Sequence, residues 1–240
     1  MWPLLFFIFK ASALEIVLRA VFQPSVSKLN GCKDLSFFTK EIFYLNLNNS
    51  MGSSGLTILH EGTIPTFYES LLKRTFSRLT LVQTDSGPHS PGDQSMLNVY
   101  SWIFKQHMAP DTLIYILEDD YLHRPVPTID RLFDDVFSTV KPDYATLYDH
   151  RDKYMGTNQK DPTILYFSHF LHWRTVPSTT NTFACRLRTL WRDRAIHLHY
   201  LNNDHAKFLA LRQQNRLLVS SVPGHSTHSC RGLESPFFDL

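Results

Sequence analysis

The stretch LIYILEDDYLHRP, residues 113–125, decides the fold, because an apolar run and a group of acidic residues meet in it. Its first five residues are apolar, and three carboxylates, those of Glu118, Asp119 and Asp120, follow directly. A continuous apolar run predicts a strand that is buried on both faces, as in a parallel sheet covered by helices on either side. Adjacent carboxylates repel one another, so we expect a cation or solvent to relieve the charge at the end of this strand.

Runs with strand character alternate with runs of helical spacing along the rest of the chain. The expected strands are residues 15–22, 56–62, 78–85 and 112–120. The expected helices are residues 27–47, 63–76, 93–107 and 127–137. Such alternation is typical of a doubly wound α/β fold. With 240 residues and 43% hydrophobic content, the chain suits one Rossmann-like α/β domain with a mostly parallel central sheet flanked by helices.

The composition argues against several classes of protein. A net charge of +2 is too small to indicate binding to nucleic acid. Three widely spaced cysteines without a CxxC pair predict neither a zinc knuckle nor a disulfide framework, and they favour a reducing compartment. The sequence has no P-loop, no GxGxxG after a strand and no GxSxG, which argues against P-loop NTPases, dehydrogenases and serine hydrolases.

The apolar N-terminal leader, residues 1–14, is interrupted by Lys10 and is therefore too short to span a membrane. No other stretch is long enough, so we expect no transmembrane span. A packed or loosely ordered leader is the favoured interpretation, and a membrane-surface anchor is the alternative. The chain is accordingly expected to be cytoplasmic, with peripheral association with a membrane left open.

Acidic residues follow two of the expected strands, Glu61 after the second and the three carboxylates after the fourth. Ligands of open α/β sheets bind beyond the carboxyl ends of the strands, and gathered carboxylate oxygens suit Mg²⁺ or Mn²⁺. Alternation along an extended chain would put Glu118 and Asp120 on one side. The alternative is that the acids cap the following helix, but a cap calls for one acid rather than three.

The order of strand ends VFQPS (21–25), LHEGT (59–63) and ILEDDYL (116–122) resembles the GT-A fold of nucleotide-sugar glycosyltransferases, closest to the family-2 type. The resemblance implies that the first two strand ends hold the nucleotide and that the acidic DxD motif holds a divalent cation, Mn²⁺ or Mg²⁺, on the donor diphosphate. Here the motif is Glu-Asp-Asp, a departure from strict DxD. Later segments (DYATLYDHRDKY, STTNTFACR and PGHSTHS) look like those of small viral and bacterial GT-A proteins.

The resemblance also implies roles for single residues. Those implied to bind the donor nucleotide and its sugar are Phe22, Gln23, Pro24, Glu61, Asp119 and Asp120. Those implied to bind the metal are Glu118, Asp120 and His228. Asp204, which precedes an amphipathic helical pattern, is implied as the catalytic base of an inverting transfer. An ordinary helix N-cap is the alternative for Asp204, and an exposed loop position is the alternative for His228.

By this resemblance the chain is a metal-dependent glycosyltransferase of the hexosyl- or deoxyhexosyltransferase type, with a nucleotide-diphosphate sugar as donor. The acceptor would be a glycan, a glycoprotein or a lipid-linked molecule. The nucleotide-binding half would be residues 15–125 and the acceptor half residues 126–240. One alternative is a sugar-phosphate nucleotidyltransferase, but that class usually begins with a glycine-rich basic loop, which residues 21–30 lack. A catalytically inactive GT-A-like binding module is the other alternative.

Overall fold

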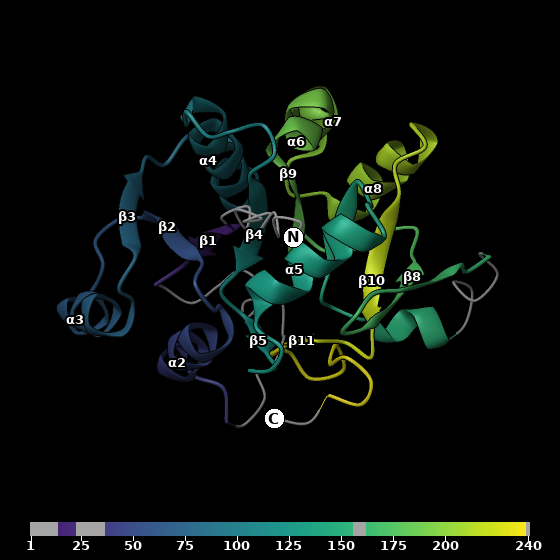
Figure 1. Cartoon of the computed structure of the whole chain (residues 1–240). Coiled ribbons are helices and arrows are strands. Elements are labelled where there is room, and N and C mark those ends of the chain that lie inside the picture. The colour runs from purple at the N-terminus through teal and green to yellow at the C-terminus, as the bar shows by residue number, and fades with distance from the viewer. Residues whose placement is uncertain (1–13, 23–36, 156–161, 239–240) are drawn as a thin grey trace, which may run out of the picture.

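The computed structural model describes residues 14–22, 37–155 and 162–238 (Figure 1). Residues 1–13 of the leader lie outside the described residues, as do the expected donor-binding residues Gln23 and Pro24. In the described part of the chain, no helix has the length and apolar character needed to cross a membrane.

Within the described residues, a nine-stranded sheet runs through the protein in the order β3-β2-β1-β4-β9-β6-β10-β8-β7. Its strands are β1 (Leu14–Ala20), β2 (Gly55–Glu61), β3 (Leu79–Thr84), β4 (Leu113–Glu118), β6 (Tyr144–Thr146), β7 (Leu165–Phe167), β8 (His172–Thr175), β9 (Phe183–Arg186) and β10 (Leu218–Val222). The four strands β3, β2, β1 and β4 are parallel, as are β6 and β10, whereas β9 is antiparallel to both β4 and β6. A separate pair joins β5 (Tyr121–His123) to β11 (Ser226–His228).

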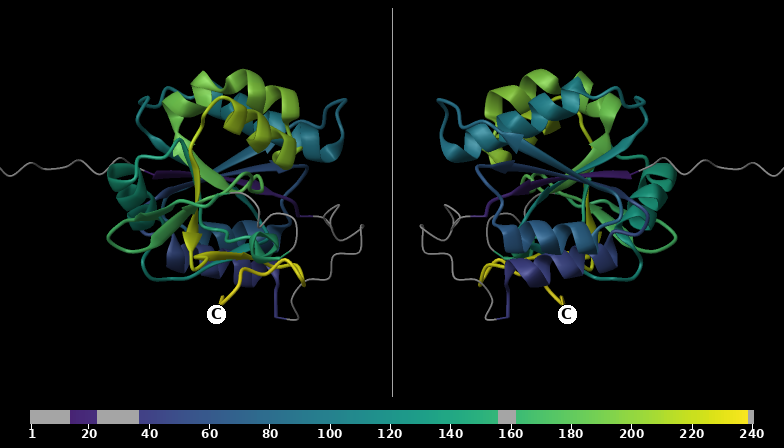
Figure 2. Two further views of the ribbon diagram at one scale, coloured as in Figure 1. Left: turned by 90° about the vertical axis from the view of Figure 1, so that its right-hand side faces the viewer. Right: turned by 90° about the vertical axis from the view of Figure 1, so that its left-hand side faces the viewer.

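Helices cover both faces of this sheet (Figure 2). They are α2 (Lys40–Ser50), α3 (Thr66–Thr75), α4 (Pro91–Lys105), α5 (Ile129–Thr139), α6 (Leu187–Arg192), α7 (Arg194–Tyr200) and α8 (Asp204–Gln213), with a short 3-10 turn, η1 (Arg151–Tyr154). Figure 2 shows α4 in one layer with α6, α7 and α8, and α2 and α3 in the opposite layer. The sheet flanked by helices confirms the fold class expected from the sequence.

The apolar run of β4 is buried on both faces, as the sequence predicts. Ile114 and Ile116 belong to a core cluster that includes residues of α4, α6 and α8. Leu113, Tyr115 and Leu117 belong to a second cluster with residues of α2, α3 and α5. Alternate side chains of one strand therefore hold both helical layers to the sheet.

Most of the expected elements match the observed ones with small changes at their ends. The first expected helix, residues 27–47, is wrong in its start, because α2 is Lys40–Ser50 and residues 37–39 are not helical, while residues 27–36 lie outside the described residues. The four expected strands coincide with β1 to β4 within a few residues. The fourth expected helix begins at Ile129, and the third begins at Pro91 because the Ser90 hydroxyl accepts a hydrogen bond from Asp93 N and caps it. The second expected helix, residues 63–76, begins later than expected, because α3 starts at Thr66 and Pro65 is its N-cap residue.

The cysteines differ from the expectation. Cys185 is free and buried, whereas Cys230 takes part in a disulfide bond. Cys32 lies outside the described residues. The spacing predicts no disulfide framework and does not address a single bond between distant cysteines, which depends on distance in the fold and not on spacing along the chain. The inference of a reducing compartment from cysteine spacing loses its basis.

The antiparallel strand β9 matters for the position of the candidate site. Because β9 runs opposite to β4, the residues just before β9 lie at the same edge of the sheet as the carboxyl end of β4. The backbone N–H of Glu118 donates to Thr182 Oγ1 at 3.3 Å, which ties these two segments together. Residues far apart in the sequence thus meet at the edge where ligands of α/β sheets bind.

Candidate functional site

Glu118 ends β4, and Arg19 lies directly opposite it on β1 in the parallel register. The Arg19 Nη2 atom is 2.6 Å from Glu118 Oε1, and both side chains are mostly buried. Charge-assisted contacts of this length are among the stronger hydrogen bonds of proteins. The first acid of the cluster is therefore held by a cation from the neighbouring strand.

Asp119 is held by a second cation, Lys40, which is the first residue of α2. Lys40 Nζ lies 2.6 Å from Asp119 Oδ2, and the same oxygen accepts a hydrogen bond from Val21 N at 2.8 Å. Lys40 Nζ also donates to the backbone carbonyl of Asp119 at 3.1 Å. These contacts join the start of α2, the end of β1 and the end of β4.

Asp120 is the least satisfied acid of the three. Its Oδ1 atom is buried and has no hydrogen-bond partner within the described residues. Desolvation of the carboxylate raises the pKa of Asp120 to about 8, and the negative charges of Glu118 and Asp119 add to this effect. An acid that is costly to ionise attracts a cation or a hydrogen-bond donor.

The late histidine His228 reaches the acid cluster through the β5–β11 pair, in which it lies opposite Tyr121. Its Nε2 atom is 3.5 Å from Asp120 Oδ2, and its ring packs edge-on against Tyr121 at 4.9 Å. Its Nδ1 accepts a hydrogen bond from Cys230 N at 2.9 Å. In a neutral ring the proton is then on Nε2, so His228 offers Asp120 a hydrogen-bond donor rather than offering a metal a lone pair.

The expected metal ligands can now be compared with what a divalent cation needs. Glu118 is paired with Arg19, and His228 presents a proton. Among the residues that the structure describes, no group of three or more histidine, cysteine or acidic side chains is arranged to hold a metal. The orphaned Oδ1 of Asp120 does fit a cation, since a buried carboxylate oxygen without a donor is unfavourable.

An aromatic cluster lies at the ends of β1 and β2, where the resemblance implies the nucleotide. Its centre is Phe22, whose ring is 5.5 Å from that of Tyr68, 6.1 Å from that of His60 and 6.4 Å from that of Tyr44. Phe22 is partly exposed, and Glu61 at the end of β2 is exposed. A partly exposed aromatic ring such as that of Phe22 can stack on a planar ring such as a nucleotide base.

Asp204 begins α8, but it is not the N-cap. That role belongs to Asn203, whose side-chain oxygen accepts a hydrogen bond from Ala206 N at 3.2 Å. The cap interpretation of Asp204 is therefore wrong. Burial raises the pKa of Asp204, and the negative charge of Glu118 raises it further. Asp204 is therefore within electrostatic reach of Glu118 although the two are distant in the sequence.

Two asparagines connect the start of α8 to the acids. Asn202 Oδ1 accepts hydrogen bonds from Arg19 Nη1 at 3.0 Å and from Asn181 Nδ2 at 3.2 Å. Asn181 Oδ1 in turn accepts a hydrogen bond from Lys207 Nζ. Arg19 therefore links Glu118 to the loop that leads into α8.

A directional chain of hydrogen bonds continues inward from Lys207, whose side chain is fully buried. Lys207 Nζ donates to Tyr100 OH at 3.0 Å, and Tyr100 OH lies 3.1 Å from His197 Nδ1. His197 Nε2 lies 2.9 Å from Tyr144 OH, which donates to Asp193 Oδ2 at 2.9 Å. Each group can donate to the next, so the whole chain is satisfied with a neutral histidine.

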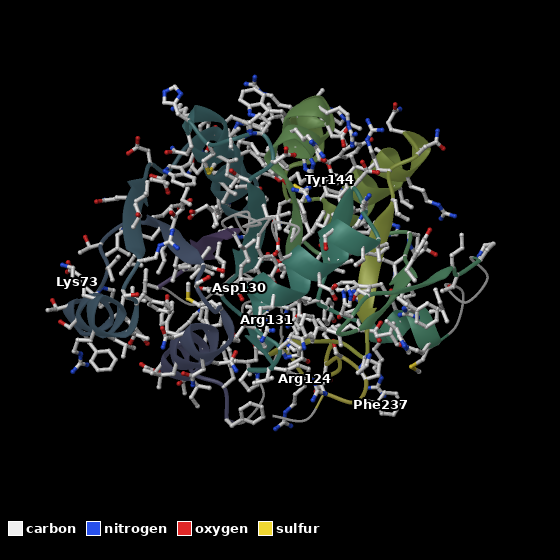
Figure 3. All side chains as sticks on the ribbon, in the orientation of Figure 1. Lys73, Arg124, Asp130, Arg131, Tyr144 and Phe237 are labelled. Carbon is white, nitrogen blue, oxygen red and sulfur yellow. The ribbon has the colours of Figure 1, made fainter. Side chains whose placement is uncertain are left out.

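Charges within this chain follow from burial. Burial lowers the pKa of His197 to about 3, so the ring is neutral at physiological pH. Burial also lowers the pKa of Lys207 to about 7. At the far end, Asp193 is paired with Arg216, whose Nη2 lies 2.7 Å from Asp193 Oδ1, and these bonds help to lower the pKa of Asp193. Tyr144, which is labelled in Figure 3, connects His197 to Asp193.

The structure therefore brings together most of the site residues that the sequence singles out. Glu118, Asp119, Asp120, His228 and Asp204 lie in one connected region. Phe22 and Glu61 lie at the ends of the neighbouring strands β1 and β2. Sequence reasoning missed the cations Arg19 and Lys40 and the residues Asn181, Asn202 and Lys207. A signal for Arg19 existed, since an arginine near the end of an apolar strand needs a partner or water.

The sequence matches no protein-family model and no curated protein. Solved structures that resemble this one include 4-diphosphocytidyl-2C-methyl-D-erythritol synthase from Anaerococcus prevotii, with a TM-score of 0.46 and 10% identity over 90% of this chain and 89% of that one. Another is TarS of S. aureus, with a TM-score of 0.48 and 11% identity over 87% of this chain and 57% of that one. A third is CMP:2-keto-3-deoxy-manno-octonic acid synthetase with CTP, with a TM-score of 0.47 and 12% identity over 89% of this chain and 92% of that one.

Proposed function

We propose that this protein is a glycosyltransferase that moves a hexosyl or deoxyhexosyl group from a nucleotide-diphosphate sugar to an acceptor hydroxyl. The observation that supports the proposal best is the link from Glu118 through Arg19 to Asn202, which ties the acids of β4 to the segment that leads into Asp204. A transferase of this kind needs a base for the acceptor and a cationic or metal-binding surface for the leaving diphosphate. In this proposal Asp204 is that base, and the acids of β4 with Arg19 and Lys40 form that surface.

Asp204 acts as the general base in this proposal. Its pKa is raised by burial and by the charge of Glu118, which brings the carboxylate closer to the working range of a base near neutral pH. Asp204 takes the proton of the acceptor hydroxyl as the oxygen attacks the anomeric carbon. A new carbon–oxygen bond forms there, the bond to the diphosphate breaks with its electron pair, and the configuration is inverted.

The donor lies along the ends of β1, β2 and β4. Phe22 and its aromatic neighbours stack on the base, with Glu61 beside it, and Asp119 contacts the ribose. Arg19 and Lys40 offset the negative charges of Glu118 and Asp119, so the diphosphate meets less repulsion beside these acids. Asp120 would hold a divalent cation, Mn²⁺ or Mg²⁺, which would neutralise charge on the departing nucleoside diphosphate. The acceptor is a glycan, a glycoprotein or a lipid-linked molecule.

Calorimetry with UDP and with GDP, each with and without Mn²⁺, tests the proposal. We expect one of these nucleotides to bind, and to bind more tightly with Mn²⁺. The Asp120→Asn variant should lose the effect of the metal, whereas Asp111→Asn should keep it, because Asp111 is an exposed acid paired with Arg188. Failure of both nucleotides to bind in the presence of Mn²⁺ contradicts the proposal.

A sugar-phosphate nucleotidyltransferase is the second candidate. The unpartnered carboxylate oxygen of Asp120 supports it too, since a divalent cation bound there would also suit a nucleoside triphosphate. The two reactions differ in their products. A nucleotidyltransferase releases pyrophosphate from a nucleoside triphosphate and a sugar phosphate, whereas a glycosyltransferase releases a nucleoside diphosphate from a nucleotide sugar. Assays for both products in parallel distinguish them. Nucleotide binding without either product would indicate an inactive binding module.

A further inference from the structure

Residues 178–182, which precede β9, form a polar and uncharged segment with the sequence STTNT. Four of its five side chains are buried, and that of Thr180 is partly exposed. Thr182 Oγ1 accepts a hydrogen bond from Glu118 N at 3.3 Å, and Tyr121 OH donates to Thr180 Oγ1 at 3.0 Å. The segment therefore contacts both the end of β4 and the first residue of β5.

Asn181 extends these contacts to α8, the helix that begins with Asp204. Asn181 is only 2% exposed, and its Nδ2 donates to two atoms of Asn202, the side-chain Oδ1 at 3.2 Å and the backbone carbonyl oxygen at 3.3 Å. The same carbonyl oxygen accepts a hydrogen bond from Asp204 N at 3.0 Å. A single residue, Asn202, therefore connects the amide of Asn181 to the proposed base.

The groups at the two ends of this link fix the direction of its hydrogen bonds. Lys207 Nζ donates to Asn181 Oδ1, and Arg19 Nη1 donates to Asn202 Oδ1 at 3.0 Å. Lysine and arginine side chains can only donate, so both amide oxygens accept, and the amide nitrogen of Asn181 is left to donate to Asn202. Since Arg19 also holds Glu118, the two asparagines connect that acid to the start of α8.

We propose that Asn181 is a positioning residue of the glycosyl transfer, which through Asn202 fixes the place of Asp204 relative to the acids of β4. This inference rests on the proposed function, because the reaction that Asn181 serves is that transfer. Asn181 is buried and acts through Asn202 rather than on the substrate. A catalytic group that moves by about 1 Å can cost about 100-fold in rate, so the link matters more for turnover than for binding of the donor.

Kinetics of three variants test the direction of the link. Asn181→Asp keeps an acceptor for Lys207 but replaces the donor with an oxygen that faces Asn202, so kcat should fall at least about tenfold while the KM for the donor stays within about twofold. Asn202→Ala removes the acceptor and should have the same effect. Asn202→Asp restores an acceptor, so its kcat should exceed that of Asn202→Ala at least about fivefold.

Hydrogen exchange followed by mass spectrometry tests the positioning without any transfer. In Asn181→Asp and Asn202→Ala, the backbone amides of residues 204–208 should exchange at least about fivefold faster than in the wild type, because the start of α8 loses its attachment. Asn215→Asp is the matched control, since Asn215 is an exposed asparagine beyond the other end of α8. Asn202 is also exposed, so Asn202→Ala remains a test even if Asn181→Asp does not fold.

Wild-type kcat in Asn181→Asp or Asn202→Ala would overturn the inference, as would equal losses of kcat in Asn202→Ala and Asn202→Asp. If the wild type transfers no sugar, the proposed function fails, and hydrogen exchange then decides the role of Asn181 by itself. Faster exchange at the start of α8 in Asn181→Asp, with Asn215→Asp unchanged, would support that role. Exchange at the wild-type rate in Asn181→Asp and Asn202→Ala would reject it.

Discussion

Arg19 and Glu118 face each other across two parallel strands, with Arg19 Nη2 2.6 Å from Glu118 Oε1. Lys40 holds Asp119 in the same way, and His228 lies beside Asp120. The chain's own basic side chains therefore relieve the repulsion among the three adjacent acids. A metal that binds here has to compete with them for the carboxylates.

The Arg19→Met variant tests this competition. Removing the guanidinium frees Glu118 to bind a cation, so we expect Mn²⁺ to bind about tenfold more tightly, which corresponds to about 1.4 kcal/mol. Calorimetric titration with Mn²⁺ in the absence of nucleotide measures the change. Arg188→Met is the control, because its partner Asp111 is exposed and precedes β4, whereas Glu118 lies at the other end of that strand. Unchanged Mn²⁺ affinity in Arg19→Met would mean that Glu118 does not take part in binding the metal.

The Asp204→Asn variant tests the base. The substitution removes the proton acceptor and keeps the shape, so we expect the donor nucleotide to bind as in the wild type while transfer falls by at least about 100-fold. Release of nucleoside diphosphate and calorimetric binding report on the two steps separately. Asn203→Asp provides a control, since aspartate also caps helices well. Full transfer activity in Asp204→Asn would reject Asp204 as the base.

Lys207 makes stability depend on pH. Its pKa is lowered to about 7 in the fold, whereas a lysine in an unfolded chain titrates near 10.4. Between these values the unfolded state binds more protons than the native state, so the free energy of unfolding rises with pH. Below the folded pKa both states are protonated and this contribution is lost. Urea unfolding from about pH 6 to about pH 9 should show the wild type gaining stability relative to Lys207→Met. Parallel curves for the two proteins would show that Lys207 keeps an ordinary pKa.

Tyr144→Phe tests the buried hydrogen-bond chain. Loss of the hydroxyl leaves His197 Nε2 and Asp193 Oδ2 each short of one partner in a buried place, at a cost of about 1–3 kcal/mol. The measurement is the free energy of unfolding in urea. Tyr200→Phe is the comparison, because Tyr200 is only partly buried and packs its ring against His199. Equal stability of Tyr144→Phe and the wild type would indicate that the chain contributes nothing net.

Local periodicity in the sequence is enough to predict β1 to β4 and, apart from the start of α2, the helices between them. It is enough because a continuous apolar run, such as that of β4, reflects the burial of a strand between two layers of helices. The order of strand ends also led to the acids, to Asp204 and to His228. The structure brings these residues together, while their chemical roles stay predictions.

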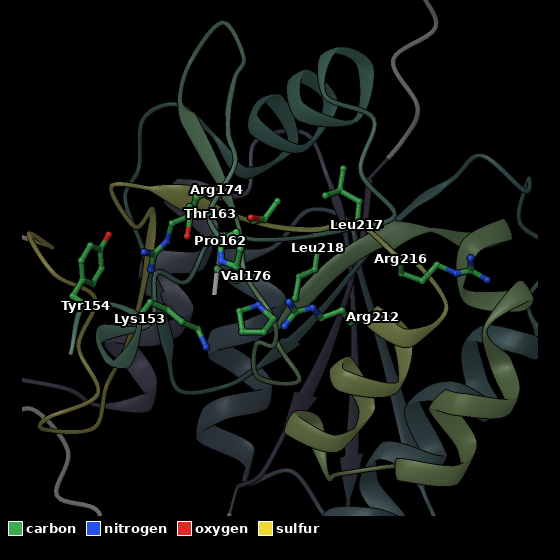
Figure 4. A pocket seen from close by; sticks show the side chains of 12 residues that line it. Lys153, Tyr154, Pro162, Thr163, Arg174, Val176, Arg212, Arg216, Leu217 and Leu218 are labelled. Carbon is green, nitrogen blue, oxygen red and sulfur yellow. The ribbon is translucent and has the colours of Figure 1, made fainter. Parts of the chain in front are cut away.

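What the sequence could not provide is the set of contacts between distant segments. Arg19 pairs with Glu118 through strand register, and Lys40 reaches Asp119 from a different helix. A cavity of about 370 Å³ that Arg174 helps to line is formed by η1, β8, β10 and the end of α8, which no local pattern connects (Figure 4). The disulfide of Cys230 was missed for the same reason. Each of these features depends on tertiary geometry, which single-sequence patterns do not encode.

The position of β9 has a consequence for biosynthesis. This strand is made after β6 but lies between β4 and β6, and it pairs with both. Until residues 183–186 leave the ribosome, the backbone groups along that side of β4 have no partner strand. Exposed apolar strand edges recruit other chains, so a fragment that ends near residue 125 is expected to aggregate rather than to remain soluble. Expression of that fragment alone, compared with the whole chain, would reveal whether the first half depends on the second for its solubility.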